Sequence, residues 1–306
     1  MASWSTISVP AERRSIDLNA DLGEAGDGAG VAIERALLGL VTSAHVACGG
    51  HAGDEESMRA TVQAALDAGV RVGAHPSYPD RAGFGRRPME MAASDLASSL
   101  AEQISGLMEV AASLGAEVCS VKPHGALYGE VGGDAATFDA LTGVLAALCE
   151  PGTALVLPAG APAVAWADRA GISVLEEGFA DRAYTAGGGL LARQEPGSVY
   201  REPARAVAQA LGLVERGTVV AADGTLMARQ QPGSVYRDPE QAAAQALGLA
   251  ERGTVTAADG TTLTLAVDTL CLHGDSPNAL AMARAVRAAL HDAGIAVAVP
   301  PQRRPA

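Results

Sequence analysis

The sequence predicts an α/β domain in which the strands form a TIM-like (β/α) barrel of seven units. Short apolar runs rich in β-forming residues alternate with longer helical patterns, which is typical of a parallel sheet joined by crossover helices. Polar side chains follow nearly every one of these runs, and barrels of this kind assemble their active sites from the carboxyl ends of several strands. A chain of 306 residues has room for such a domain.

Seven segments have the length and residue types of buried strands, and their number favours seven units over eight. In chain order they are Ser15–Asn19, Ala44–Cys48, Val70–His75, Glu117–Lys122, Ala154–Pro158, Ile172–Glu176 and Thr269–His273.

Helical periodicity is found between these strands. The segment Glu55–Ala68, for example, places Met58, Val62, Ala65 and Leu66 on one face. The last predicted helix opens with an N-cap serine, Ser276, followed by proline at the first helical position. The predicted helices are Glu55–Ala68, Ser94–Leu114, Ala135–Leu148 and Pro277–Ala293.

Composition excludes several classes of partner and location. The net charge of −13 argues against nucleic acid and against an anionic membrane, since both attract basic surfaces. The four cysteines show no CxxC spacing, so neither a zinc ribbon nor a disulfide framework is predicted. The first residues lack the basic and apolar regions of a signal peptide, and no run of about 18 apolar residues could span a bilayer. We therefore expect a cytoplasmic protein.

A single lysine marks one of the strand ends. Of the 22 Lys and Arg residues only Lys122 is lysine, and it lies two positions before His124. Lysine is a compact point charge, and burial can shift its pKa, whereas arginine is a planar fork that stays charged. A lone lysine in an arginine-rich chain therefore indicates a site that needs an amine, although chance is the alternative.

The spacing of polar residues on the strands predicts which of them share a face. Side chains two positions apart on a strand point the same way, so Asp17, Asn19 and Asp21 are expected on one face. The same spacing groups Lys122 with His124. It also groups His273 with Asp275, if strand geometry extends that far. Ionisable groups turned into a barrel have to pair, bind a metal or act on a ligand.

Four of the six histidines, His51, His75, His124 and His273, lie at four strand ends. They are suited to acid/base chemistry, or to binding a metal together with Asp17 and Asp21. The alternative is that each is a core histidine with satisfied hydrogen bonds, just as Asp54 is equally well explained as a helix N-cap.

Six motifs follow one another along the chain: D-L-N-A-D-L-G-E (Asp17–Glu24), A-C-G-G-H-A-G-D (Ala47–Asp54), G-A-H-P-S-Y-P-D-R-A-G-F-G-R-R (Gly73–Arg87), V-K-P-H-G-A-L-Y (Val121–Tyr128), F-A-D-R-A-Y (Phe179–Tyr184) and C-L-H-G-D (Cys271–Asp275). Together, and in this order, they resemble the LamB/YcsF family of 5-oxoprolinase A subunits, and the resemblance runs from about Ser15 to Ile295. The chain departs from the family pattern at His45, where the family usually has Asn, and at Gly50, where it has a bulky residue.

The resemblance implies ATP-dependent opening of 5-oxo-L-proline to L-glutamate by a complex of this chain with two partners, subunits B and C. It also implies a barrel of the glycoside hydrolase/deacetylase type. The catalytic candidates are Asp17, Asp21, Lys122, His124 and Asp275. Candidates for binding substrate or nucleotide are Asn19, Glu24, His51, His75, Arg86, Arg87, Tyr128, Asp181, Arg182 and His273. If a divalent metal is bound, Asp17, His51, His75 and His124 are its candidate ligands.

ATP has no phosphate-binding loop in this chain, because no G-x-x-x-x-G-K-[ST] motif occurs. Any contact with ATP would come from Lys122, from Arg86 or Arg87, or from an interface shared with the partner subunits. Arginine pairs can grip a phosphate or a carboxylate, although a solvated loop also explains them. Two other functions remain open: a metal-dependent hydrolase that acts alone, and a non-catalytic subunit that only binds substrate.

A tandem repeat interrupts the barrel pattern between the sixth and seventh strands. Leu190–Thr225 and Leu226–Thr261 are 36 residues each and agree at 28 positions, which indicates a duplication. Copy one has Val207 and Val214 where copy two has alanines, a difference of about 3 kcal/mol in apolar burial, so we expect copy one to dock on the barrel. The predicted organisation is an extension at 1–14, a barrel at 15–295 and a disordered tail at 296–306.

Overall fold

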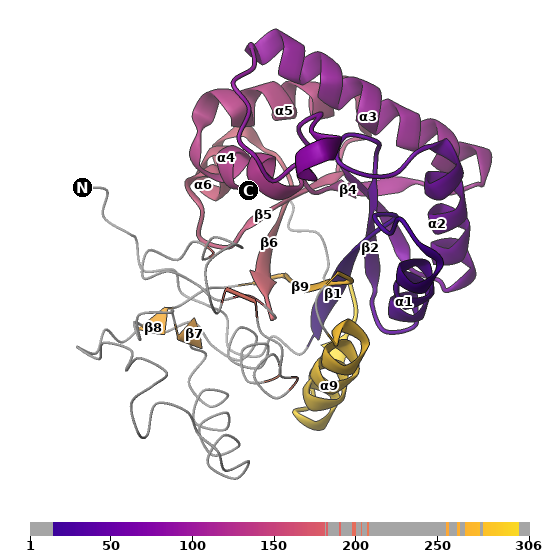
Figure 1. Cartoon of the computed structure of the whole chain (residues 1–306). Coiled ribbons are helices and arrows are strands. Elements are labelled where there is room, and N and C mark those ends of the chain that lie inside the picture. The colour runs from indigo at the N-terminus through magenta and orange to yellow at the C-terminus, as the bar shows by residue number, and fades with distance from the viewer. Residues whose placement is uncertain are drawn as a thin grey trace, which may run out of the picture.

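Seven parallel strands close into a barrel in the computed structural model, which confirms the fold class predicted from the sequence (Figure 1). The structure describes residues 15–180, 267–275 and 278–299, with positions 182, 190, 198–199, 203, 207, 255–256 and 262–263. The strands of the barrel are β1 (Ser15–Leu22), β2 (Ser43–Ala47), β3 (Arg71–His75), β4 (Val118–Val121), β5 (Ala154–Pro158), β6 (Val174–Phe179) and β9 (Thr269–His273).

Strand β1 closes the barrel because it pairs with both β2 and β9. Asp17 lies opposite Thr269, and Asp21 lies opposite His273 on one side and His45 on the other. Strands β6 and β9 pair directly, although almost ninety residues separate them in the sequence. Residues far apart along the chain thus meet at defined heights inside the barrel.

The alternation along β1 follows the predicted spacing. Ile16, Leu18 and Ala20 are completely buried in the hydrophobic core. Asp17, Asn19 and Asp21 are also buried, but their hydrogen bonds run to polar side chains on other strands or directly next to them. A barrel strand has two buried faces, and here one is apolar and the other polar.

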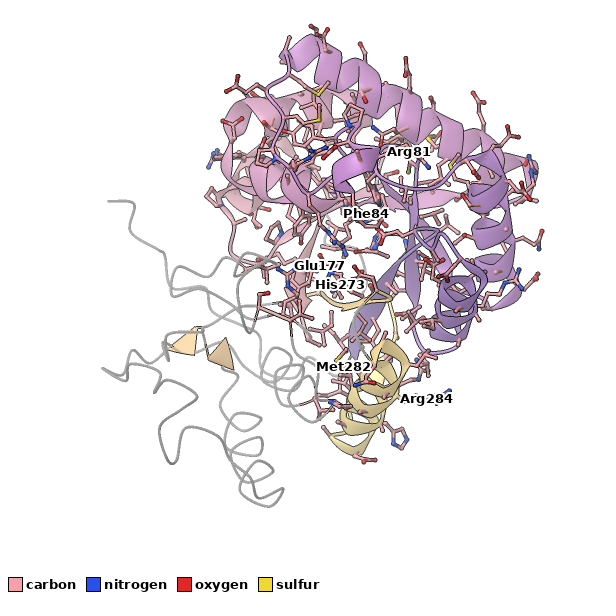
Figure 2. The ribbon with its side chains drawn as sticks, in the orientation of Figure 1. Arg81, Phe84, Glu177, His273, Met282 and Arg284 are labelled. Carbon is pink, nitrogen blue, oxygen red and sulfur yellow. The ribbon has the colours of Figure 1, made fainter. Side chains whose placement is uncertain are left out.

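Helices cover the outside of the barrel, as Figures 1 and 2 show. In α3, Leu96, Leu100, Ile104 and Leu107 recur at helical spacing and are buried, at about 2 kcal/mol of apolar burial each. The helices are α1 (Gly28–Leu38), α2 (Glu55–Asp67), α3 (Ala93–Ser113), α4 (Gly125–Gly133), α5 (Ala135–Leu148), α6 (Pro162–Ala170) and α9 (Ala279–Asp292), with a short 3-10 turn η1 (Arg81–Gly83).

Several elements differ from the sequence expectation. Helices α1, α4 and α6 were not predicted, and β1 and β6 each run three residues further than expected. Helix α9 begins at Ala279, with Asn278 at its N-cap, so the predicted start at Pro277 is wrong; Ser276 and Pro277 lie outside the described residues. Asp54 caps α2 through a reciprocal capping box with Ser57, so a structural role accounts for that residue.

The carboxyl-terminal boundary also needs correction. Ala296 and Val297, placed by sequence in a disordered tail, form strand β10 (Ala296–Val297) beside Ser15 and Ile16 of β1. A two-residue antiparallel pair, β7 (Val255–Thr256) and β8 (Thr262–Leu263), follows most of the repeat. Most of both repeat copies lies outside the described residues, as does the extension 1–14. In copy one, Val207 is helical and packs against the core.

Among the described helices, no single one has the length and hydropathy needed to cross a bilayer. Helices α4 and α5 meet those criteria only as a pair, and the pair is bent by 105°.

Candidate active site

Polar and ionisable side chains from six of the seven strands meet inside the barrel and at the carboxyl ends of its strands. Glu177 and His273, labelled in Figure 2, mark the side formed by β6 and β9, and Phe84 marks the loop after β3. The parallel register brings these ends together, as expected for a barrel of this type.

Asp17 lies deeper in the barrel than the other acidic candidates. Thr42 Oγ1 and Ser43 Oγ donate to its Oδ1 at 2.6 and 2.8 Å, and Thr269 Oγ1 donates to its Oδ2 at 2.6 Å. Three hydroxyl donors therefore satisfy this carboxylate and join β1 to β2 and β9. Among the described residues, Asp17 belongs to no group of clustered metal-ligating atoms, so the structure does not bring it to the predicted histidines.

Lys122 is the centre of a buried ion cluster. Its Nζ donates to Asp21 Oδ1 at 2.8 Å and lies 2.8 Å from Glu177 Oε1, while the lysine side chain is only 3% exposed. Asn19 Oδ1 and Cys271 Sγ also lie 3.2 Å from the ammonium. Four partners on three strands thus surround one amine, which makes Lys122 the cationic centre of the barrel.

The charges in this cluster stabilise one another. Burial alone would lower the pKa of Lys122, but Asp21, Cys271 and Glu177 raise it well above its usual value. Burial would raise the pKa of Asp21, yet the charges of His75 and Lys122 hold it well below its usual range. Lys122 is therefore an ammonium and Asp21 a carboxylate at neutral pH.

Glu177 was missed by the sequence reasoning, although it is fully integrated in the site. Asn19 Nδ2 donates to Glu177 Oε1 at 2.8 Å, and Tyr128 Oη donates to Oε2 at 2.7 Å. The binding candidates Asn19 and Tyr128 therefore orient the second carboxylate of Lys122. The pair Glu176–Glu177 was a signal in the sequence, but the predicted strand ended at Glu176.

His45 crosses the barrel interior between β1 and β4. Its Nδ1 lies 3.3 Å from Asn19 Oδ1, and its Nε2 lies 3.2 Å from Ser120 Oγ. Burial, and then the charge of Lys122, hold the pKa of His45 well below its usual value, so the ring is neutral. Gly73 makes room for it, since a Cβ there would lie 2.5 Å from His45 Cδ2. The barrel thus provides hydrogen-bond partners and space for the histidine ring at position 45, where the family usually has Asn.

The departure at Gly50 also has a structural reason. A Cβ on Gly50 would clash with Gln103 Oε1 and would lie 2.5 Å from Ser77 Oγ. Gln103 Oε1 accepts from the backbone of Ser77 and Gln103 Nε2 donates back to its carbonyl, which fixes the amide in this place. The side chain of Gln103 fills the space that a larger residue at position 50 would need.

A second cluster joins Glu24 to three of the predicted histidines, which we call the histidine cluster: Glu24, His51, His75 and His124. Glu24 Oε1 lies 2.8 Å from His51 Nε2, 3.3 Å from His124 Nδ1 and 3.6 Å from His75 Nε2. One candidate ligand atom from each of the four residues lies within 4.8 Å of the others. The rings of His51 and His124 stack with centroids 3.6 Å apart. Three predicted site histidines and Glu24 therefore form one group.

The electrostatic environment differs among these rings. Burial lowers the pKa of His51 and, with the charges of His75 and His51, lowers that of His124 well below its usual value. Burial opposes a charge on His75 as well, but Asp21 and Glu24 raise its pKa. Asp21 Oδ2 lies 3.4 Å from His75 Nε2 and thereby links the histidine cluster to the ion cluster of Lys122.

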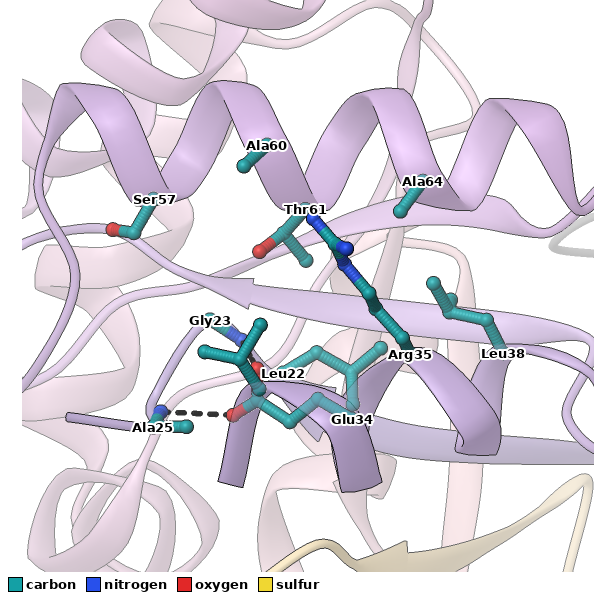
Figure 3. Close-up of a pocket in the computed structure, with 11 residues that line it drawn as sticks. Leu22, Gly23, Ala25, Glu34, Arg35, Leu38, Ser57, Ala60, Thr61 and Ala64 are labelled. Atoms are coloured by element: carbon teal, nitrogen blue, oxygen red, sulfur yellow. Dashed lines mark hydrogen bonds between the residues drawn. The ribbon is translucent and has the colours of Figure 1, made fainter. Parts of the chain in front are cut away.

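Glu34 on α1 fixes the loop that carries Glu24. Its carboxylate accepts backbone N–H groups of Gly23, Glu24 and Ala25 at 2.9 to 3.0 Å, and Figure 3 shows the bond to Ala25. The pocket drawn in Figure 3 lies between α1 and α2 on the outer side of this loop, and its lining includes none of the predicted site residues. Glu34 therefore positions Glu24 from outside the barrel.

The two predicted arginines have different surroundings. Arg86 Nη2 donates to Asp275 Oδ2 at 2.7 Å, and its guanidinium lies 4.7 Å from the centroid of the Phe84 ring. Arg87 instead pairs with Asp80, and its side chain is 66% exposed. The structure thus joins the candidates Arg86 and Asp275 at the rim but directs Arg87 away from them.

The remaining candidates lie on β9 and after β6. His273 stacks on Phe179 with centroids 5.6 Å apart and forms a second group of clustered ligand atoms with Asp21 and Cys271. Arg182 is buried, and its Nε donates to the carbonyl of Ser198 at 3.3 Å, while Asp181 lies outside the described residues.

Comparison with known proteins identifies relatives along almost the whole chain. The LamB/YcsF family model matches residues 16–227 and 220–304, two segments that meet near the boundary between the repeat copies. The 5-oxoprolinase A subunit of Methylococcus capsulatus is 43% identical over 285 residues, which cover 93% of this chain and 95% of that protein. The 5-oxoprolinase A subunit of Paracidovorax citrulli is 42% identical over 282 residues, covering 92% of this chain and 98% of that protein.

A solved structure is also similar to this chain over almost its whole length. The lactam utilization protein from Thermus thermophilus superposes with a TM-score of 0.74 at 34% identity, covering 94% of this chain and 100% of that chain.

Proposed function

The chain belongs to the LamB/YcsF family, and on this premise we propose that it is the A subunit of a 5-oxoprolinase. The proposed reaction is the ATP-dependent hydrolysis of 5-oxo-L-proline to L-glutamate. The names of the relatives and of the Thermus lactam utilization protein support the substrate class.

The observation that carries the proposal is the buried ammonium of Lys122 between Asp21 and Glu177, beside the histidine cluster. Opening a lactam requires water to add to the carbonyl carbon, the C–N bond to break and the ring nitrogen to gain a proton. Lys122 stabilises negative charge on the carbonyl oxygen, and the carboxylate of Asp21 accepts the proton of water. His124 acts as part of the histidine cluster.

ATP enters the proposal because a five-membered lactam is a stabilised amide. Activation of its carbonyl oxygen makes attack by water feasible. The chain carries one lysine and no phosphate-binding loop, so the nucleotide site is expected at an interface with subunits B and C. Among the described residues, Arg86 at the rim offers a guanidinium that can meet a phosphate. The proposed location is the cytoplasm.

A second candidate is a hydrolase that acts alone with a bound metal, and the histidine cluster favours it. A divalent cation held there would act as a Lewis acid toward the carbonyl oxygen. This alternative requires glutamate formation without ATP and without partners, which the leading proposal does not allow.

The decisive experiment measures glutamate release from 5-oxoproline by the purified chain, with and without subunits B and C, ATP and chelator. We expect release only when both partners and ATP are present, and slow or no ATP hydrolysis by the chain alone. Rapid ATP-independent release by the chain alone would establish the second candidate instead. If turnover by the complete complex is unchanged when it contains the His124→Gln variant, the chain has only a substrate-binding role.

A further inference from the structure

We propose that the histidine cluster is a site for one divalent transition-metal ion of the Zn²⁺ class. The ligand atoms are Glu24 Oε1, His51 Nε2, His75 Nε2 and His124 Nδ1. This deepens the proposed function, and it rests on that function only for the catalytic use of the cation. The ligand set differs from the one predicted by sequence, because Glu24 takes the place of Asp17.

The spacing of these atoms fits tetrahedral coordination. Zn–N and Zn–O bonds of about 2.0–2.1 Å place the ligand atoms of a tetrahedron about 3.3 Å apart. The distances from Glu24 Oε1 to the three histidine nitrogens are 2.8, 3.3 and 3.6 Å, and His75 Nε2 lies 3.0 Å from His124 Nδ1. These separations lie on both sides of the tetrahedral value. The rings of His51 and His124 are stacked and nearly parallel, however, so His51 has to turn before its nitrogen and that of His124 can face one ion.

Two backbone carbonyls fix the tautomers of His75 and His124. His75 Nδ1 lies 2.7 Å from the carbonyl oxygen of Lys122, and His124 Nε2 lies 2.9 Å from that of Phe84. A carbonyl can only accept, so these two nitrogens carry the protons. In the neutral rings, His75 Nε2 and His124 Nδ1 then present lone pairs toward each other at 3.0 Å, with no hydrogen between them.

The carboxylates of Asp21 and Glu24 beside His75 Nε2 favour a positive species at this point. Either a proton on His75 Nε2 or a metal ion can lie between the two facing lone pairs. A metal ion satisfies both of them and also the oxygen of Glu24, whereas a single added proton satisfies only one pair of atoms. Ligating histidines typically donate their second N–H to a carbonyl or carboxylate, which is the arrangement of His75 and His124. His51 differs, because its buried Nδ1 has no hydrogen-bond partner among the described residues. We therefore expect His51 to be the weakest of the three nitrogen ligands.

The loop that supplies the carbonyl of Phe84 is held in an unusual conformation. Phe84 has φ +54°, in the left-handed region that residues with a side chain rarely adopt. The carbonyl of the next residue, Gly85, accepts the backbone N–H of Ala126 at 2.9 Å, and a Cβ on Gly125 would clash with that same carbonyl oxygen. The loop thus packs closely on the segment that follows His124. This contact holds in place the hydrogen bond between His124 Nε2 and the carbonyl oxygen of Phe84.

The donor set also predicts which metals bind. Imidazole nitrogen suits Zn²⁺, Fe²⁺ and related transition metals, whereas Mg²⁺ and Ca²⁺ prefer oxygen ligands. Glu24 Oε1 and Asp21 Oδ2 lie 3.6 and 3.4 Å from His75 Nε2. The single charge of Lys122 is shared between Asp21 and Glu177, so the negative charge of Glu24 is left to favour a cation. We expect Zn²⁺ or Co²⁺ to bind and Mg²⁺ to compete poorly.

The test is metal binding by the purified full chain, without turnover. After chelation and dialysis against Zn²⁺, we expect one zinc per chain by elemental analysis, unchanged by excess Mg²⁺. His75→Gln and His124→Gln are expected to weaken zinc binding more than about 100-fold, beyond the loss typical of outer hydrogen-bond partners, and His51→Gln less. His45→Asn is the matched control, since it alters a buried histidine of the same barrel that offers no ligand atom, and it should retain the zinc.

Thermal unfolding separates metal binding from misfolding. Zinc should raise the melting temperature of the wild type and of His45→Asn but not of His124→Gln, because a ligand stabilises only a folded state that binds it. Less than about 0.1 zinc per chain, or full zinc binding by both His75→Gln and His124→Gln, would overturn the site. Failure to bind zinc leaves the 5-oxoprolinase assay unaffected, and failure of that assay leaves zinc binding measurable, so the two proposals fail separately.

Discussion

Replacing Lys122 by methionine removes the one cation that Asp21 and Glu177 share. Both carboxylates stay buried, at 7% and 0% side-chain exposure, and both lose an ammonium at 2.8 Å. Removing one partner of a buried ion pair typically destabilises a protein by about 3–5 kcal/mol, because it leaves an uncompensated charge. That is a large part of the roughly 5–15 kcal/mol typical of a domain. We expect a loss of this size in the free energy of unfolding.

Urea unfolding followed by circular dichroism measures this loss. Arg59→Met is the control, since Arg59 pairs with Glu55 at 3.6 Å with the side chains 47% and 78% exposed, and its loss should stay below about 1 kcal/mol. Adding Glu177→Gln to Lys122→Met removes one unpaired charge and should recover at least about 1 kcal/mol.

The pH dependence follows from the raised pKa of Lys122. A basic group whose pKa is higher in the folded than in the unfolded state stabilises the fold fully at any pH below its unfolded-state pKa, which is about 10.4 for lysine. This stabilisation is lost only as the pH rises through the folded-state pKa. The penalty of Lys122→Met should therefore be the same at pH 7 and pH 9. A penalty below about 1 kcal/mol, or no recovery on adding Glu177→Gln, would refute the assignment of Lys122 as the charge that holds this cluster together.

Three further outcomes are expected. Lys122→Arg should keep the fold, as judged by circular dichroism, but abolish turnover by the complete complex, since the site fits a compact ammonium; wild-type rates would contradict this. Gly73→Ala should destabilise the protein by about 1–3 kcal/mol, because its Cβ would clash with Ser120 Oγ, whereas Gly106→Ala, with open space around it in α3, should be neutral or stabilising. Deleting Leu226–Thr261, 36 of 306 residues, should leave a 270-residue chain at least as stable as the parent; unfolding of that chain would show that copy two is the docked copy.

The face of each site residue could be predicted from sequence, but its depth in the barrel could not. Alternation correctly put Asp17 and Asp21 on the same side of β1. Four residues of strand rise about 13 Å, however, so the two carboxylates lie in different layers and have different partners. Only the pairing of β1 with β9 reveals that Asp17 lies opposite Thr269 and Asp21 opposite His273.

Other parts of the site depend on contacts that leave no local signal. Glu176 and Glu177 are adjacent and chemically equal, and only the strand register turns Glu177 toward Lys122. The same holds for Arg86 and Arg87, which point to different partners. Helix α4, G-A-L-Y-G-E-V-G-G, has four glycines, so its helical state depends on packing rather than on propensity.

The direct pairing of β6 with β9 has a consequence for how this protein can change in length. The backbone N–H of Asp268 donates to the carbonyl of Glu176 at 2.7 Å, and the N–H of Glu176 donates to Asp268 Oδ2 at 3.0 Å, so the two strands are fastened where β9 begins. A duplication between them can therefore enter a gene without shifting any strand of the barrel. Because β10 lies beside the start of β1, the same connection could be opened and a short linker placed between Val297 and Ser15, giving a circularly permuted barrel with its site intact.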